Sequence, residues 1–261
     1  MLTTAALLSV LSGSIVGIVL GLVGGGGSIL AVPLLIHVVG MQDTHLAIGT
    51  SSVAVAANAA FNLIGHARIG NVKWRCAIVF AVSGIVGAAA GAEIGKIVDG
   101  RHLLTAFGLM MIGIGGLMLI PRRGGSDPDV MLTRETYLRL LPRLVGIGLA
   151  VGALSGFFGI GGGFLIVPGL VEATAMPLIN AIGSSLMSVT AFGATTAVSY
   201  AASGFVDWSV AGLFILGGAA GSIAGIALSR HLAARKRMLT ILFSSVVMLV
   251  GAYVVATSLT R

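Results

Sequence analysis

Charged residues are scarce in this sequence. Only 9% of its 261 residues are charged, whereas 57% are hydrophobic, and the mean hydropathy is +1.09. In soluble domains about a quarter of the residues carry a charge, so this composition excludes an ordinary soluble domain. Uncharged apolar runs recur along the chain, and about 17 to 25 such residues cross a bilayer once as a helix. We therefore predict an all-α polytopic membrane protein.

Several kinds of reactive site are also missing. The single cysteine, Cys76, excludes an intramolecular disulfide. The five histidines lack the spacing of metal ligands, and no Walker lysine follows a glycine cluster. We expect no metal, no cofactor and no enzymatic activity. No acidic residue stands at the centre of an apolar segment, so a proton relay or a carboxylate cation site has no obvious carrier, which favours an anion as the ligand.

The excess of basic residues is better explained by topology than by nucleic acid. The formal net charge is +7, but the basic residues cluster in short loops between apolar segments. Such loops face the cytoplasm in membrane proteins. The expected partners are the lipid bilayer and a small anionic substrate, with no nucleic acid. A coupling proton or cation and a homo-oligomer remain open.

A glycine cluster followed by a short apolar run and a proline occurs twice. The first copy covers residues 24–33 and the second covers 159–168, an offset of 135 residues. The motif Ala-Ile-Gly-hydroxyl at 47–50 returns at 181–184, an offset of 134. These matches indicate a duplication. The predicted organisation is a first transmembrane repeat at 1–120, a cytoplasmic linker at 121–139 and a second transmembrane repeat at 140–261.

Each repeat contains five apolar segments, and the second of each is short for a membrane crossing. The segments lie at about 3–23, 28–39, 46–65, 74–98, 103–120, 141–158, 163–174, 180–202, 208–229 and 238–258. We thus expect about eight to ten hydrophobic helices, including short or broken ones after each glycine cluster. Whether the short segments span or re-enter the bilayer is left open.

Loop charges predict that the two repeats are inverted. The basic loop at 68–75 corresponds to residues 203–207, which contain no Lys or Arg. The basic loop at 230–237 corresponds to the weaker 96–102. Equivalent loops with opposite charge bias are expected when an odd number of crossings inverts the second repeat.

Glycines at a spacing of four in the fourth segment of each repeat predict close helix packing. Small residues at this spacing let two helix backbones approach each other. They are Gly87, Gly91 and Gly95 in the first repeat and Gly217, Gly221 and Gly225 in the second.

The glycine clusters are the expected ligand site. Glycine breaks one helix, and the next helix should begin directly afterwards with unpaired N–H groups and a positive dipole end that suit an anion. Close packing or a kink is the alternative explanation. In carriers with inverted repeats such breaks lie near the bilayer midplane. The candidates in the clusters are Gly25, Gly26, Gly27, Ser28, Gly161, Gly162 and Gly163.

Polar side chains in the third segment of each repeat complete the candidate site. Asn58 and Asn62 share a helical face, and each amide needs several hydrogen-bond partners in apolar surroundings. Many of the hydroxyls could instead bond the carbonyl one turn back. The hydroxyl candidates are Thr50, Ser51, Ser52, Ser184 and Ser185.

The duplicated glycine-to-proline unit and the Ala-Ile-Gly-hydroxyl unit together resemble the sulfite exporter TauE/SafE family of membrane transporters. The resemblance covers nearly the whole chain. It implies a multi-pass carrier of the bacterial inner membrane for small sulfur-containing anions such as sulfite, sulfonates or sulfoacetate. We therefore expect a secondary transporter that works by alternating access, and a passive anion channel is the alternative. Ser28 stands where the second repeat has Gly163, so the halves should contact the ligand differently.

Overall fold

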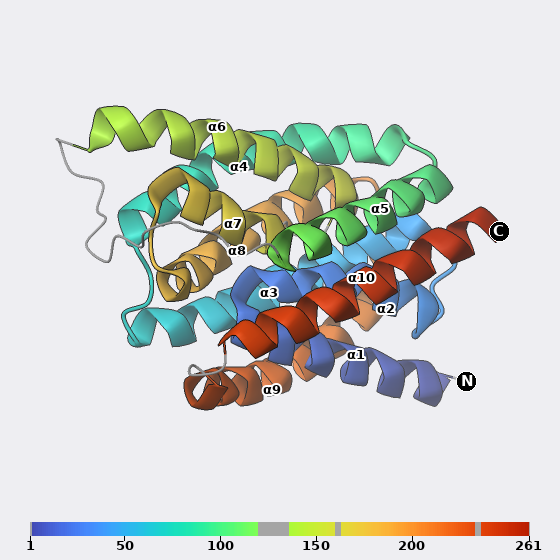
Figure 1. Ribbon diagram of the computed structural model, residues 1–261. Helices are drawn as coiled ribbons and strands as arrows, with labels where there is room; N and C mark the ends of the chain where they lie inside the picture. Colours follow the sequence, from blue (N-terminus) through green and yellow to red (C-terminus); the bar gives the residue numbers. More distant parts are fainter. Residues whose placement is uncertain (1, 120–135, 160–162, 233–235, 261) are drawn as a thin grey trace.

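The computed structural model describes residues 2–119, 136–159, 163–232 and 236–260. These residues form ten α-helices, one 3₁₀ helix and no strand, so the prediction of an all-α protein is confirmed (Figure 1). The elements are α1 Leu2–Val23, η1 Gly24–Leu30, α2 Ala31–His37, α3 Thr44–Arg68, α4 Trp74–Ile97, α5 Gly100–Leu119, α6 Tyr137–Phe158, α7 Gly163–Thr174, α8 Leu178–Ala202, α9 Trp208–Leu232 and α10 Lys236–Thr260.

Among the described residues, seven helices are long and apolar enough to cross a membrane. The segments after the glycine clusters, Gly24–His37 and Gly163–Thr174, are shorter apolar helices. This supports the polytopic architecture. Helix α6 begins at Tyr137, inside the linker predicted at 121–139, and the division into two repeats and a linker stays a prediction. The rest of that linker lies outside the described residues.

The first glycine cluster differs from the expected open break. It forms the 3₁₀ helix η1, all seven residues of which are buried, and α2 follows directly. The chain can turn here because Gly24 adopts φ +71°, a backbone conformation that side chains disfavour. In the second cluster Gly159 adopts φ +64° and ends α6. The prediction of a helix break at each cluster is thus correct, but in the first cluster the break is filled by a tight helical turn.

Helices from different halves pack in crossed pairs. α1 packs on α9, and α4 packs on α6. A Cβ added at Gly17 of α1 would overlap the carbonyl of Gly218 on α9, and one at Gly152 of α6 would overlap that of Gly84 on α4. The repeat offsets relate these two contacts, so the duplication extends to the packing. The glycine triplets of α4 and α9 line these same interfaces, as predicted.

The equivalent helices α3 and α8 pack together at the centre, between the crossed pairs. Gly49 near the start of α3 lies against Tyr200 near the end of α8, and Gly193 lies against Ala56, so the two helices run antiparallel. Antiparallel contact between equivalent helices is the geometry that inverted repeats need. The orientation of the halves in a bilayer stays a prediction.

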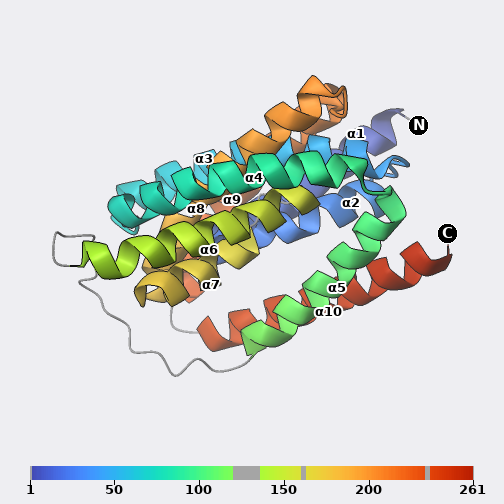
Figure 2. The ribbon, with the colours of Figure 1, turned by 90° about the horizontal axis from the view of Figure 1, so that it is seen from above.

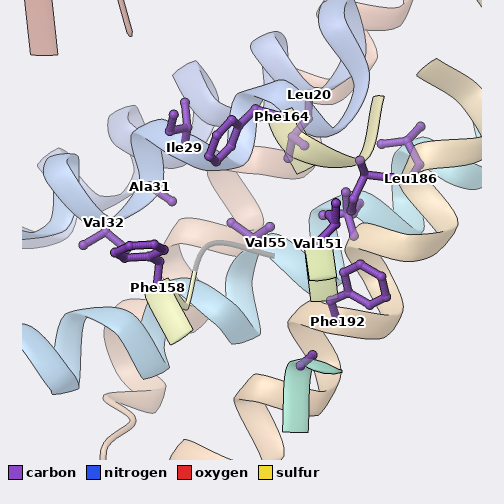
Figure 3. Packing of buried hydrophobic residues seen from close by; sticks show 14 of the residues in the cluster. Leu20, Ile29, Ala31, Val32, Val55, Val151, Phe158, Phe164, Leu186 and Phe192 are labelled. Atoms are coloured by element: carbon purple, nitrogen blue, oxygen red, sulfur yellow. The ribbon is translucent and has the colours of Figure 1, made fainter. Parts of the chain in front are cut away.

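The last helices of the two halves, α5 and α10, form a pair at one side of the molecule (Figure 2). Thr105 near the start of α5 and Ser258 near the end of α10 are joined by a 2.8 Å hydrogen bond between their hydroxyls. A continuous apolar core runs through the interior and includes residues of the central helices, the crossed pairs and the α5/α10 pair. Figure 3 shows part of it, including Ile29 of η1, Phe164 of α7 and Phe192 of α8.

Candidate functional site

The two glycine clusters meet in the interior. Gly25 of η1 lies directly against Gly163 at the start of α7, and a Cβ on either glycine would overlap the backbone of the other. Both residues are buried. Only glycine allows two peptide backbones to come this close. We refer to this contact between η1 and α7 as the glycine crossing.

Hydroxyl groups on the two central helices bond the glycine clusters. The backbone N–H of Gly25 donates to Ser185 Oγ on α8 at 3.3 Å, and Ser52 Oγ on α3 donates to the carbonyl of Gly159 at 2.9 Å. Ser28 Oγ donates to the carbonyl of Gly25 at 2.9 Å. The expectation of bare peptide nitrogens is therefore wrong for Gly25, because a serine already accepts its hydrogen bond.

Several of the predicted site residues thus lie together at the glycine crossing, and others lie near it. Gly26 and Gly27 are buried in η1, and Gly27 packs on the backbone of α1 at Leu20. Ser51 is buried as well, and its hydroxyl bonds the carbonyl of Ile48 one turn back at 2.9 Å. Gly161 and Gly162 lie outside the described residues.

Two of the predicted hydroxyls bond loops of the opposite half. Thr50 Oγ1 accepts from the backbone N–H of Asp207 at 2.9 Å, and Ser184 Oγ accepts from that of Lys73 at 2.9 Å. The repeat offset of 134 residues relates the two bonds to each other. Each clamps the start of a central helix to the loop after the other central helix. A structural role therefore explains these two hydroxyls.

Asn58 and Asn62 lie farther along α3 than Ser52. Their exposed fractions are 1% and 0%. Asn62 Nδ2 donates to Ser222 Oγ of α9 at 2.6 Å and to the carbonyl of Asn58 at 2.9 Å. Asn58 packs on Gly218, where a Cβ would overlap its amide. The two amides thus share one face of α3, as their spacing predicts, and that face lies against α9.

The interior around the crossing contains no buried formal charge. Of the residues whose side chains the structure describes, no Asp, Glu, Lys or Arg is buried. Glu93 is exposed at the end of α4 and pairs with Lys96, with an oxygen-to-nitrogen distance of 2.8 Å. A ligand at the crossing would therefore meet N–H and hydroxyl donors without a carboxylate to repel an anion.

Two further polar residues belong with the asparagines and were not among the predicted site residues. His66 lies one turn beyond Asn62 on α3, is 2% exposed and faces the backbone of Gly21. Its spacing of four from Asn62 is the signal that could have revealed it. Ser222 of α9 has no such signal, because sequence spacing does not say which helix α3 will contact.

Comparison with known proteins agrees with the fold and the motifs. A relative from Xylella fastidiosa strain 9a5c, named "Probable membrane transporter protein", is 50% identical over 94% of this chain and 92% of its own length. The Bacillus subtilis "Probable membrane transporter protein YunE" is 27% identical over 94% and 96%. No solved structure matches the chain. The family model described as "Sulfite exporter TauE/SafE" matches residues 9–254, and the chain therefore belongs to this family of membrane transporters.

Proposed function

We propose that the protein is a secondary carrier that moves small sulfur-containing anions, such as sulfite, sulfonates or sulfoacetate, by alternating access. The observation that carries the proposal is the glycine crossing, where the backbones of both halves meet in a buried region without carboxylates. Anions bind well to backbone N–H groups and hydroxyls when no negative side chain competes. The family's description as sulfite exporters supports the sulfur class.

Binding at the crossing requires an exchange of hydrogen bonds. In the structure Gly25 N–H donates to Ser185 Oγ, and Ser185 Oγ donates to the carbonyl of Ile182 at 2.8 Å. If η1 and α7 separate slightly, Gly25 N–H and the Ser185 hydroxyl can both turn to the anion. A neutral hydrogen bond contributes about 1 kcal/mol net, and a bond to a charged group about 1.5–3 kcal/mol, so the exchange favours the anion.

The crossed pairs limit which parts can move. Since α1 is packed on α9 and α6 on α4 through glycine contacts, rigid separation of the two halves would break both interfaces. We therefore assign the alternating motion to the pairs α1/α9 and α4/α6, each moving as a unit against α3 and α8.

The test is transport in proteoliposomes. Purified protein is screened by thermal shift against sulfite, sulfate, thiosulfate, taurine, sulfoacetate and plain carboxylates, because a ligand of the native state raises its apparent stability. The anions that stabilise the protein are then used in counterflow. Saturable counterflow of a sulfur-containing anion is expected. Counterflow of carboxylates alone would overturn the substrate class.

A passive anion channel is the alternative. The glycine crossing argues for the carrier, because in the structure buried backbone contacts close the centre of the molecule. Single-channel currents in planar bilayers, together with an absence of counterflow, would establish the channel instead.

A further inference from the structure

A line of buried polar groups runs along the C-terminal half of α3. Asn58, Asn62 and His66 follow one another at a spacing of four on α3 and so share a helical face. Ser222 of α9 faces Asn62. All four are at most 2% exposed. We call these four residues the polar seam.

The polar seam contains hydrogen-bonding atoms without partners. Asn62 Nδ2 and Ser222 Oγ are satisfied, since Ser222 Oγ also donates to the carbonyl of Gly218 at 2.7 Å. Within the described part of the chain, Asn62 Oδ1 and both polar atoms of the Asn58 amide have no hydrogen-bond partner. Each such buried atom costs about 1–3 kcal/mol. A ligand that forms hydrogen bonds with these atoms would remove that cost.

The equivalent line in the second half is largely aromatic. The repeat offset pairs Asn58 with Phe192, His66 with Tyr200 and Asn62 with Thr196. Phe192 stacks on Phe80 of α4 with ring centroids 6.4 Å apart, and the position of Ser222 is taken by Ala88.

The two aromatic-line hydroxyls, those of Thr196 and Tyr200, also lack a partner among the described residues. A threonine in a helix can satisfy its hydroxyl by turning to the carbonyl one turn back, whereas an asparagine amide needs several outside partners. In the described part of the structure, the polar seam therefore leaves three amide atoms of Asn58 and Asn62 unpaired, whereas its counterpart leaves one hydroxyl, that of Tyr200, without such a local alternative.

The loops that follow α3 and α8 carry charges of opposite sign. The polar seam ends where α3 ends, and the following loop carries Arg68, Lys73 and Arg75 with no acidic residue. The counterpart loop after α8 carries Asp207 and no basic residue. A mouth of one sign raises the local concentration of ions of the opposite sign. The polar seam thus runs toward a loop whose charge attracts anions.

We infer that the polar seam is a second binding subsite for the transported oxyanion, between α3 and α9 and next to the basic loop at 68–75. This inference rests on the proposed function. Asn58 Nδ2 and a ring N–H of His66 donate to the anion, and Asn62 Oδ1 accepts from its water or acidic proton. A cation would leave the Asn58 amide nitrogen unpaired and would be repelled by the basic mouth. Phe192 blocks the corresponding route in the other half.

The test is cysteine labelling with sulfonatoethyl methanethiosulfonate, a membrane-impermeant thiol reagent that is itself a small sulfonate. Cys76 is replaced by alanine to remove the native thiol. Single cysteines are then placed in the polar seam as N62C and S222C. The matched controls at the equivalent positions of the second half are T196C and A88C. S222C changes one atom of the side chain and serves where N62C fails to fold.

The polar-seam cysteines should react at least about tenfold faster than their controls, and faster in inside-out vesicles than in spheroplasts because the basic loops face the cytoplasm. Sulfate or sulfoacetate should slow the reaction. Sulfite is left out because it cleaves thiosulfonates. Equal labelling of T196C and A88C, no labelling of N62C and S222C, or labelling that no anion slows would each overturn the inference. A wild-type protein without anion flux would instead overturn the proposed function.

Discussion

The two halves of the chain share their backbone contacts but differ in the side chains along their central helices. Both halves have a left-handed residue at the glycine cluster and a hydroxyl clamp onto the opposite loop. The polar seam of α3, by contrast, is replaced by aromatic rings on α8. Where the backbones of the crossed pairs touch, only glycine fits, so both halves keep it at equivalent positions such as Gly17 and Gly152. Side chains along the proposed anion path are under no such constraint and can differ between the halves. The shared backbone contacts therefore define the scaffold. The differing side chains make the two sides of the scaffold chemically unlike.

The largest effect is expected where the shared scaffold is tightest. Gly163→Ala places a Cβ in the backbone of Gly25, so we expect a destabilisation of about 3 kcal/mol or more and loss of anion flux. Gly113→Ala on α5, where an added Cβ has no neighbour within 4 Å, is the control. It should leave stability unchanged or raise it by up to about 1 kcal/mol. Thermal melting in detergent measures the stability of both variants. Equal melting temperatures for Gly163→Ala and Gly113→Ala would contradict the close backbone contact at the glycine crossing.

The crossed pairs should respond symmetrically. Gly17→Ala overlaps Gly218, and its equivalent Gly152→Ala overlaps Gly84. We expect each to destabilise the protein by about 1–3 kcal/mol, the usual cost of overpacking, with similar values for the two. Chemical or thermal unfolding of the two variants in the same detergent tests this. A large loss at one position with none at the other would break the equivalence of the halves.

The polar seam should respond asymmetrically. Asn62→Leu removes the amide oxygen that we assign to the anion's water or acidic proton, and we expect flux to fall about tenfold, which is about 1.4 kcal/mol and within the net value of one neutral hydrogen bond. Thr196→Val, the equivalent change on α8, should keep flux within about twofold of the wild type. Initial rates of counterflow provide the measurement. If Thr196→Val lowers flux as much as Asn62→Leu does, the polar seam of α3 and its counterpart on α8 have the same functional importance.

The smallest effect is expected at the hydroxyl clamps. Thr50→Val and Ser184→Ala each remove one acceptor for a loop N–H, so each should cost about 1 kcal/mol of stability. Because these two hydroxyls bond loop N–H groups and not the glycine clusters, the affinity for anions should be unchanged. Melting and ligand titration separate the two quantities. If either variant binds anions more weakly but keeps its stability, the hydroxyl contributes to anion binding.

Much of the fold follows from the sequence because helices in a membrane are set by local apolar length. The segment predicted at 163–174 matches α7, and the segment predicted at 74–98 matches α4 to within a residue. The predicted packing role of the glycine triplets holds for the same local reason. Glycine spacing marks a face that another backbone approaches, but it does not name the partner, so the crossed pairing of α1 with α9 had to come from the structure.

The candidate site was less accessible to sequence reasoning. Hydroxyls near the glycine clusters look alike in sequence, yet Ser52 bonds Gly159 while Thr50 bonds a loop. The difference depends on which face of α3 each residue occupies relative to α8. The pairing of Asn62 with Ser222 likewise arises from contact between helices far apart in the chain. The binding role of the predicted residues stays a prediction.

The crossed pairs also have a consequence for biosynthesis. α1 leaves the ribosome well before its partner α9, which begins only at Trp208, so the glycine face of α1 has no partner helix until α9 is made. The N-terminal half cannot complete its own packing, and α4 likewise waits for α6. Folding of this protein must therefore finish after translation of α9, when late helices insert beside early ones.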